Sequence, residues 1–133
     1  MGPILLVEDE PDLAAATANV LRDAGFEVEI AVDGLDAIAK IGTLAQTPSV
    51  VVMDLNMPRV DGYRLFQWLR SQDAYRTLPV LVVTASRERH VPSASGVVHK
   101  PYKSNVLVGM IDALCNRRPV PAEYVEPPQM WFG

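Results

Sequence analysis

The sequence of 133 residues contains a single cysteine and no long hydrophobic run. Cys115 on its own cannot form an internal disulfide bond or a thiolate metal cage, so we expect an inert, partly buried thiol on a helix. No stretch approaches the roughly 18 apolar residues of a membrane-spanning helix. The apolar start, residues 1–7, has no basic segment and predicts a strand instead of a signal peptide. These absences predict a cytoplasmic protein.

The chain also has no excess of basic residues. The chain has 12 Lys and Arg against 16 Asp and Glu, a net charge of −4, which argues against a nucleic-acid-binding surface. His90 and His99 have no carboxylate or cysteine partner at metal-binding spacing, so we do not expect a histidine metal site. Hydrophobic residues make up 49% of the chain, enough for the core of one folded domain.

Short apolar runs alternate with helical patterns along most of the chain. The runs are apolar throughout, which is typical of strands buried on both faces of a parallel sheet. Repeated strand–helix alternation favours a doubly wound α/β fold. The expected strands are residues 4–7, 27–32, 50–53, 80–83 and 96–99, and the expected helices are residues 11–24, 35–44, 63–70 and 104–116.

Polar side chains follow four of the five expected strands. Ligands of an open parallel sheet bind beyond the carboxyl ends of its strands, so we expect these side chains to share one crevice. They are Glu8 and Asp9 after the first strand, Asp54 after the third, Thr84 after the fourth and Lys100 after the fifth.

The residue types in this crevice suit phosphoryl chemistry. Three carboxylates close together repel one another unless a cation is present. Mg²⁺ binds oxygen ligands, commonly one or two carboxylates together with a phosphate. A lysine offers a positive charge, and a threonine hydroxyl offers a hydrogen bond, to phosphoryl oxygens. Because carboxylates can form aspartyl phosphates, the crevice predicts phosphorylation of an aspartate with Mg²⁺ as the cofactor.

At this point the sequence resembles a known family, the CheY-like receiver domains of response regulators in two-component signalling. The resemblance covers about residues 3–117 and implies a flavodoxin-like sheet of five parallel strands in the order 2-1-3-4-5. No single motif is distinctive, but their order at the strand ends is. The motifs are Leu6-Val7-Glu8-Asp9-Glu10, Met53-Asp54-Leu55-Asn56-Met57-Pro58, Asp61-Gly62, Val83-Thr84-Ala85 and Lys100-Pro101-Tyr102.

The resemblance also implies a role for each residue of the crevice. Asp54 is then the acceptor of a phosphoryl group from a histidine kinase or phosphotransfer protein. Thr84 and Lys100 bind the phosphoryl oxygens. The implied Mg²⁺ ligands are Asp9, Asp54, the backbone carbonyl of Asn56, and Glu8 acting largely through a water molecule.

The segment between the fourth and fifth strands departs from the family pattern. Residues 85–95 connect the fourth strand to the fifth. Because the loops at both ends take up part of this segment, it has room for at most a turn or two of helix. Pro92 and the small residues after it make even that helix short. We therefore expect the fourth helix of the family to be shortened or replaced by a loop.

Val97 is the second departure. The family usually has a tyrosine or phenylalanine three residues before its lysine, and that ring turns inward when the threonine binds phosphate. Valine has no ring, so we do not expect this readout. One hypothesis is that residues 86–95 reorder when Asp54 is phosphorylated, which unchanged amide exchange in this segment would refute. For the Lys100–Pro101 bond, base rates favour trans, whereas the family often has cis.

The end of the chain changes character. We expect a receiver domain over residues 1–117 and a proline-rich tail over residues 118–133. Met130, Trp131 and Phe132 form an apolar cluster, and such clusters tend to find cover. Folding back on the domain, docking on another protein and a disordered end are the three alternatives for this tail.

Three functions fit the sequence. The first is a stand-alone receiver that signals through phosphorylation-dependent protein binding, with no catalysis beyond self-phosphorylation and autodephosphorylation. The second is a pseudo-receiver, favoured by Val97 and opposed by the intact acid set with Thr84 and Lys100. The third is a phosphatase of the haloacid dehalogenase type, but Asn56 stands where such enzymes need an aspartate. The kinase, the downstream partner and a homodimer stay open, and we expect neither nucleic acid nor membrane as a partner.

Overall fold

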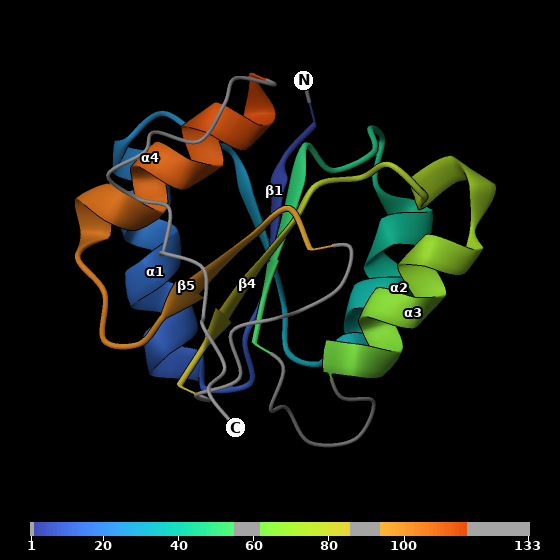
Figure 1. Ribbon diagram of the computed structural model, residues 1–133, viewed down its shortest axis with the longest axis horizontal. Helices are drawn as coiled ribbons and strands as arrows, with labels where there is room; N and C mark the ends of the chain where they lie inside the picture. The colour runs from blue at the N-terminus through green and yellow to red at the C-terminus, as the bar shows by residue number, and fades with distance from the viewer. Residues whose placement is uncertain (1, 55–61, 86–93, 117–133) are drawn as a thin grey trace, which may run out of the picture.

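The computed structural model describes residues 2–54, 62–85 and 94–116. This part of the chain forms a parallel sheet with helices on both faces (Figure 1). Its strands are β1 (Ile4–Val7), β2 (Val28–Ala31), β3 (Val50–Met53), β4 (Val80–Thr84) and β5 (Gly96–His99). Its helices are α1 (Pro11–Asp23), α2 (Gly34–Thr43), α3 (Gly62–Ser71) and α4 (Ser104–Cys115), with a short 3₁₀ helix at Asp73–Tyr75.

The strand order is β2-β1-β3-β4-β5, with every neighbouring pair parallel. Helices α2 and α3 cover one face of the sheet, and α1 and α4 cover the other (Figure 1). The predicted flavodoxin-like fold is therefore confirmed. No helix lies between β4 and β5 among the residues that the structure describes, but residues 86–93 of that connection lie outside them.

Local hydrogen bonding decides where two elements end. Helix α1 stops before Gly25, whose φ of 99° lies in the left-handed region that favours glycine. Strand β2 ends one residue earlier than predicted because the backbone N–H of Val32 donates to Asp36 Oδ2 (2.9 Å) instead of continuing the ladder. The side chain of Asp33 caps α2 by accepting from the backbone N–H of Asp36 (2.8 Å).

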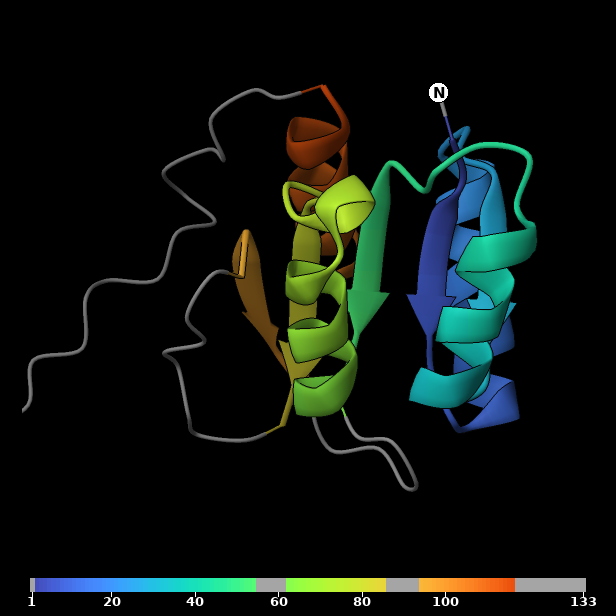
Figure 2. The ribbon, with the colours of Figure 1, turned by 90° about the vertical axis from the view of Figure 1, so that its right-hand side faces the viewer.

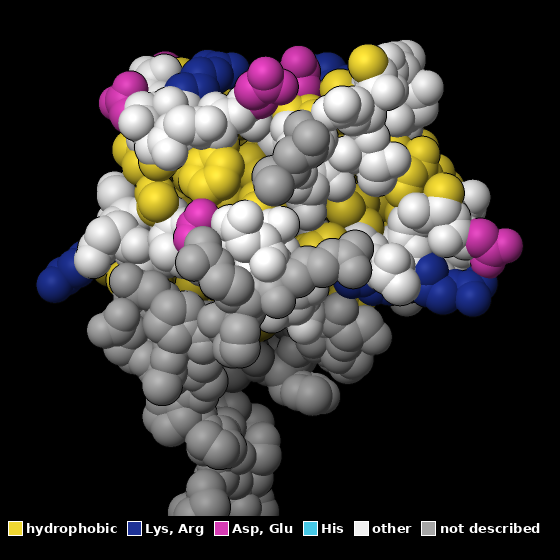
Figure 3. Space-filling model, turned by 90° about the horizontal axis from the view of Figure 1, so that it is seen from above, with side chains coloured by type: hydrophobic (Ala, Val, Ile, Leu, Met, Phe, Trp, Pro, Cys, Tyr) yellow, Lys and Arg dark blue, Asp and Glu magenta, His cyan; other side chains and the backbone are white. Residues whose placement is uncertain are grey.

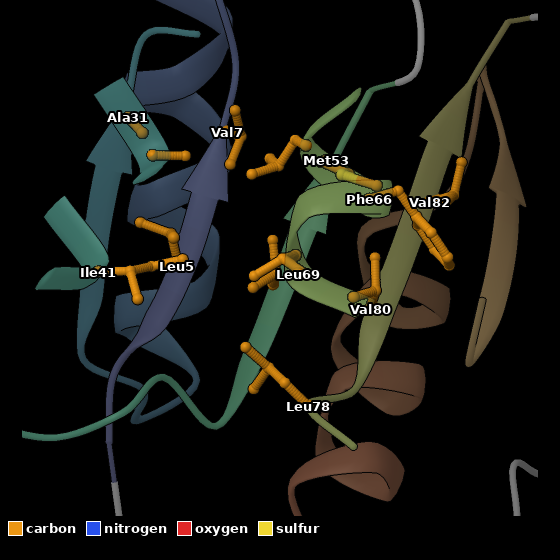
Figure 4. Close-up of a cluster of buried hydrophobic side chains, with 13 residues drawn as sticks. Leu5, Val7, Ala31, Ile41, Met53, Phe66, Leu69, Leu78, Val80 and Val82 are labelled. Carbon is orange, nitrogen blue, oxygen red and sulfur yellow. The ribbon is translucent and has the colours of Figure 1, made fainter. Parts of the chain in front are cut away.

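Buried apolar side chains on both faces of the sheet hold the layers together. Strands β1, β3 and β4 are buried along their whole length, which explains their continuous apolar runs. On the face of α2 and α3, side chains such as Leu5, Met53 and Leu69 pack into one cluster (Figure 4). A second cluster joins the sheet to α1 and α4. No helix in the described ranges is long and apolar enough to cross a membrane.

Candidate functional site

The ends of β1 and β3 place two carboxylates side by side. Val7 pairs with Met53 in the parallel ladder between these strands. Glu8 and Asp54 are the next residues of the two strands, and neighbouring strands lie about 4.8 Å apart. Two acids that are far apart in the sequence therefore project from the same edge of the sheet.

The ends of β4 and β5 bring in a hydroxyl and a cation. Thr84 pairs with His99 in the ladder, and the backbone N–H of Lys100 donates to the carbonyl oxygen of Thr84 (2.9 Å). This hydrogen bond extends the contact between the strands by one residue and fixes where the lysine side chain starts. The Lys100–Pro101 peptide bond that follows is cis, as in the resembled family and against the base-rate expectation.

Lys100 joins the acids of the site. Its Nζ donates a hydrogen bond to Asp54 Oδ2 at 3.0 Å and lies 3.9 Å from Glu8 Oε2. The side chains of Lys100, Asp54 and Glu8 are only 26%, 15% and 10% exposed. Partial burial weakens solvent screening, so these charges interact more strongly than a pair on the open surface.

The ionisation of Glu8 and Lys100 reflects this shared environment. Burial raises the pKa of Glu8, and Lys100 and the backbone N–H of Glu10 only partly counter it, while the charges of Asp9 and Asp54 raise it further. Burial alone would lower the pKa of Lys100, but the hydrogen bond and charge of Asp54, with the charge of Glu8, outweigh burial and raise it. The site therefore favours the charged form of Lys100, and the carboxylates of Glu8, Asp9 and Asp54 repel one another.

The other predicted site residues take different positions. Thr84 is completely buried at the end of β4. Asp9 is exposed at the rim. Asn56, whose carbonyl was predicted to bind Mg²⁺, lies outside the described residues. The structure thus brings Glu8, Asp54 and Lys100 into direct contact and sets the remaining described residues around them.

A small cavity of about 20 Å³ lies beneath the charged groups. Glu8, Asp54 and Lys100 line it together with Thr17 and Tyr102. Its volume is close to that of one buried water molecule, so a larger ligand would have to sit at the solvent-facing rim.

The donor set is compatible with Mg²⁺. No group of three or more Asp, Glu, His or Cys side chains in the described part of the chain is gathered closely enough to form a complete metal cage. Mg²⁺ does not need one, since it keeps several waters and takes one or two protein carboxylates. Burial, with smaller contributions from the charges of Asp9 and Asp54, raises the pKa of Glu8, and the charge of a divalent cation would favour the ionised carboxylate.

Tyr102 is a site residue to which the sequence analysis gave no role. It lines the small cavity, and its interaction with Lys100 favours the charged lysine. Tyr102 also lines a groove of about 430 Å³ between α1 and the start of α4, together with Leu13 and Leu107. The signal available in the sequence was its place in the Lys100-Pro101-Tyr102 motif.

Val97 and His99 lie on the outer strand β5. Val97 is half-buried against the cluster on the α2–α3 face, so a short side chain occupies the position where the family usually has an aromatic ring. His99 follows two residues later and pairs with Thr84. The sequence does not predict this neighbour of His99, because strand register is a tertiary property.

Comparison with known proteins agrees with the geometry. Residues 4–112 match the model of the response regulator receiver domain. Protein Rrf1 of Nitratidesulfovibrio vulgaris is 36% identical over 111 residues, which are 82% of this chain and 79% of that protein. The transcriptional regulatory protein TrcR of Mycobacterium tuberculosis is 34% identical over 86% of this chain, but the matched region is only 45% of that protein.

Solved structures show the same architecture. The signal receiver domain of a signal transduction histidine kinase from Syntrophus aciditrophicus has a TM-score of 0.77 at 28% identity, covering 99% of this chain and 100% of that chain. The chemotaxis protein CheY4 of Vibrio cholerae has a TM-score of 0.75 at 28% identity, covering 86% and 98%. With the fold, the strand-end residues and these relatives in agreement, the chain belongs to the response regulator receiver domain family of two-component signalling.

Proposed function

We propose that Asp54 accepts a phosphoryl group from the phosphohistidine of a histidine kinase or phosphotransfer protein, and that the phosphorylated protein signals by binding a protein partner. The observation that carries the proposal is the contact of Lys100 Nζ with Asp54 Oδ2 at 3.0 Å, with Glu8 Oε2 3.9 Å from the same nitrogen. This contact places a cation where a phosphoryl group on Asp54 would carry its negative charge.

The chemical step transfers a phosphoryl group from a histidine nitrogen of the donor to a carboxylate oxygen of Asp54. A carboxylate oxygen of Asp54 attacks the phosphorus, the P–N bond breaks, and a P–O bond forms an acyl phosphate. The imidazole of the donor leaves with the electron pair of the broken bond and carries a proton taken from solvent or from the donor protein. The attacking group is the carboxylate of Asp54, whose Oδ2 accepts the hydrogen bond from Lys100 Nζ.

The other residues act on the transferred group. Lys100 can exchange its hydrogen bond from the carboxylate to a phosphoryl oxygen, because both are anionic acceptors at the same end of the sheet. Thr84 can donate its hydroxyl hydrogen to a second oxygen. Mg²⁺, held by Asp9, Asp54 and the carbonyl of Asn56 with Glu8 acting through water, would neutralise charge that develops on the phosphoryl oxygens.

The proposal is tested by phosphorylation without a protein donor. The protein is incubated with phosphoramidate and MgCl₂, and the adduct is measured by intact mass and by its lability to hydroxylamine. We expect one labile phosphoryl group on the unaltered protein and on Asp23→Asn, a control at an exposed acid at the end of α1. We expect none on Asp54→Asn.

Three results would contradict the proposal. Absence of any adduct on the unaltered, folded protein would indicate a pseudo-receiver that works as an interaction module without phosphorylation. An adduct of equal yield on Asp54→Asn would place the acceptor elsewhere. Continuous hydrolysis of unrelated phosphate esters would instead point to phosphatase activity.

A further inference from the structure

Strand β2 lies at an edge of the sheet, because the strand order is β2-β1-β3-β4-β5. Figure 2 shows β5 at one margin of the sheet and helices α1 and α2 at the opposite margin, and both helices contact β2. An edge strand carries a row of backbone N–H and C=O groups on its outer side, and a strand of another molecule can add to them. The outer side of β2 is therefore a possible site of association.

The hydrogen bonds between β1 and β2 identify these outer groups. The carbonyl oxygen of Glu27 accepts from the backbone N–H of Ile4 (2.8 Å), so the backbone groups of Glu27 face β1. The backbone groups of successive residues in a strand point to opposite sides. The residues whose backbone groups point away from β1 are therefore Val28, Ile30 and Val32.

Both outer carbonyl oxygens within β2 accept hydrogen bonds from side chains of the flanking helices. Arg22 Nη2 on α1 donates to the carbonyl oxygen of Val28 (3.0 Å). Lys40 Nζ on α2 donates to the carbonyl oxygen of Ile30. One helix on each face of the sheet thus sends a basic side chain around to the edge.

The N–H group at the end of this edge also has a partner. The backbone N–H of Val32 donates to Asp36 Oδ2 on α2 (2.9 Å), and the same oxygen lies 3.4 Å from Lys40 Nζ. The side chains of Lys40 and Asp36 are 37% and 30% exposed, so the pair lies partly against the protein. We call Arg22, Lys40 and Asp36 the edge caps of β2.

An incoming strand would have to displace these contacts. Hydrogen bonds with a charged partner are roughly twice as strong as neutral ones, whereas an added strand offers only neutral backbone groups. Arg22 and Lys40 also stand in the last turns of their helices, where the helix dipole favours a cation. Displacement of the edge caps by a neutral strand is therefore unfavourable.

We propose that the edge caps prevent a second copy of this chain from adding to β2. A second copy is the expected partner because, in an antiparallel pair of two β2 strands, the outer N–H groups of each copy face the outer carbonyl oxygens of the other. Val32 (52% exposed) and Leu35 (53% exposed) follow this edge, and such a pairing would cover part of their apolar surface. The inference does not depend on the phosphoryl chemistry.

A different surface for self-association lies at the end of the molecule where the strands begin. Figure 3 views this end and shows hydrophobic side chains between polar and charged ones. Leu78, Leu114 and Cys115 line a hollow of about 330 Å³ there. Association through this end would leave the outer N–H groups of β2 in solvent, so hydrogen exchange at those groups distinguishes the two surfaces.

The test removes both basic edge caps in the double variant Arg22→Met/Lys40→Met. Methionine has an unbranched side chain and no hydrogen-bond donor. The matched control is Arg76→Met/Lys103→Met, because both residues are exposed and neither lies on α1, α2 or β2. Both double variants carry two methionines more than the unaltered protein, and both change the net charge from −4 to −4 − 2 = −6.

Sedimentation velocity over a range of concentrations measures the weight-average mass. We expect the mass of Arg22→Met/Lys40→Met to reach roughly twice that of the unaltered protein at the same concentration, as for a two-fold pair. The control should match the unaltered protein. By NMR, the amide protons of Val28 and Ile30 should exchange about tenfold more slowly in the associated variant, because they then form ladder hydrogen bonds.

Four results would overturn the inference. The first is an unchanged mass in the folded double variant, and the second is an equal increase in the control. The third is association without slower exchange at Val28 and Ile30, which places the interface elsewhere. The fourth is an unaltered protein that already associates with these two amides protected.

Thermal unfolding shows whether the double variant is folded. If it is not, the single variants Arg22→Met and Lys40→Met are measured in the same way. We expect each to increase in mass with concentration more steeply than the unaltered protein, since each frees one outer carbonyl oxygen. No increase in either single variant would also overturn the inference.

Discussion

Lys100 Nζ donates a hydrogen bond to Asp54 Oδ2 across 3.0 Å, although the two residues are 46 positions apart in the chain. The pair sits where β3 and β5 end, with the end of β4 between them. The lysine cation therefore contacts the carboxylate that we propose as the phosphoryl acceptor. Phosphorylation would have to replace this contact, which links the chemistry at Asp54 to the outer strand β5.

Replacing Lys100 by methionine is expected to lower the free energy of unfolding at pH 7 by about 1–2 kcal/mol, because Glu8 and Asp54 lose their shared cation. Since the acids raise the pKa of Lys100, its contribution is fully present below the unfolded-state pKa of about 10.4 and is lost only as pH rises through the folded value. Urea unfolding at pH 7 measures the loss.

Lys103→Met is the control for this change. Lys103 is exposed just before α4, so its replacement is expected to alter the free energy of unfolding by less than about 0.5 kcal/mol. An equal effect in both variants would mean that the contact with Asp54 and Glu8 does not stabilise the fold.

Glu8→Gln is expected to stabilise the protein at pH 7 when no divalent cation is present. Burial raises the pKa of Glu8, so the folded state binds its proton more tightly than the unfolded state does. The free energy of unfolding of the unaltered protein therefore decreases as pH rises from the unfolded-state value of about 4.3 through the folded value. Glutamine removes this decrease. Thermal unfolding in EDTA at several pH values checks it, and a variant less stable than the unaltered protein at pH 7 would contradict it.

Mg²⁺ is expected to raise the melting temperature of the unaltered protein. A ligand that binds only the folded state at ten times its dissociation constant stabilises it by about 1.4 kcal/mol. Asp54→Asn should lose most of this stabilisation, whereas Asp23→Asn should keep it. Thermal unfolding with increasing MgCl₂ provides the measurement. The same shift in all three proteins would place the ion away from Asp54.

Leu69→Ala is expected to lower the free energy of unfolding by about 2–5 kcal/mol. Leu69 is completely buried where α3 packs on the sheet, so truncation leaves a cavity (Figure 4). Gln67→Ala on the exposed side of the same helix should change it by less than about 0.5 kcal/mol. Chemical denaturation of both variants is the check, and a similar small effect in both would show that α3 packs differently.

Local patterns in the sequence predicted most of the fold. The continuous apolar runs predicted the strands because each run is buried on both faces of the sheet. The end of β2 was placed one residue too late, because the competing hydrogen bond of Val32 to Asp36 is a side-chain contact that apolar patterning does not report. The 3₁₀ helix at Asp73–Tyr75 was not predicted, since three residues are too few for a periodic signal.

The sequence by itself determined which residue types stand at the strand ends, and so it identified Glu8, Asp54, Thr84 and Lys100 as one group. A parallel sheet leaves its carboxyl ends at one edge whatever the details of packing. Only the tertiary structure decided which members of the group touch. Strand order and register set the 3.0 Å contact of Lys100 with Asp54 and the pairing of Thr84 with His99. These relationships join residues from different strands, and no local pattern in the chain specifies the distance between them.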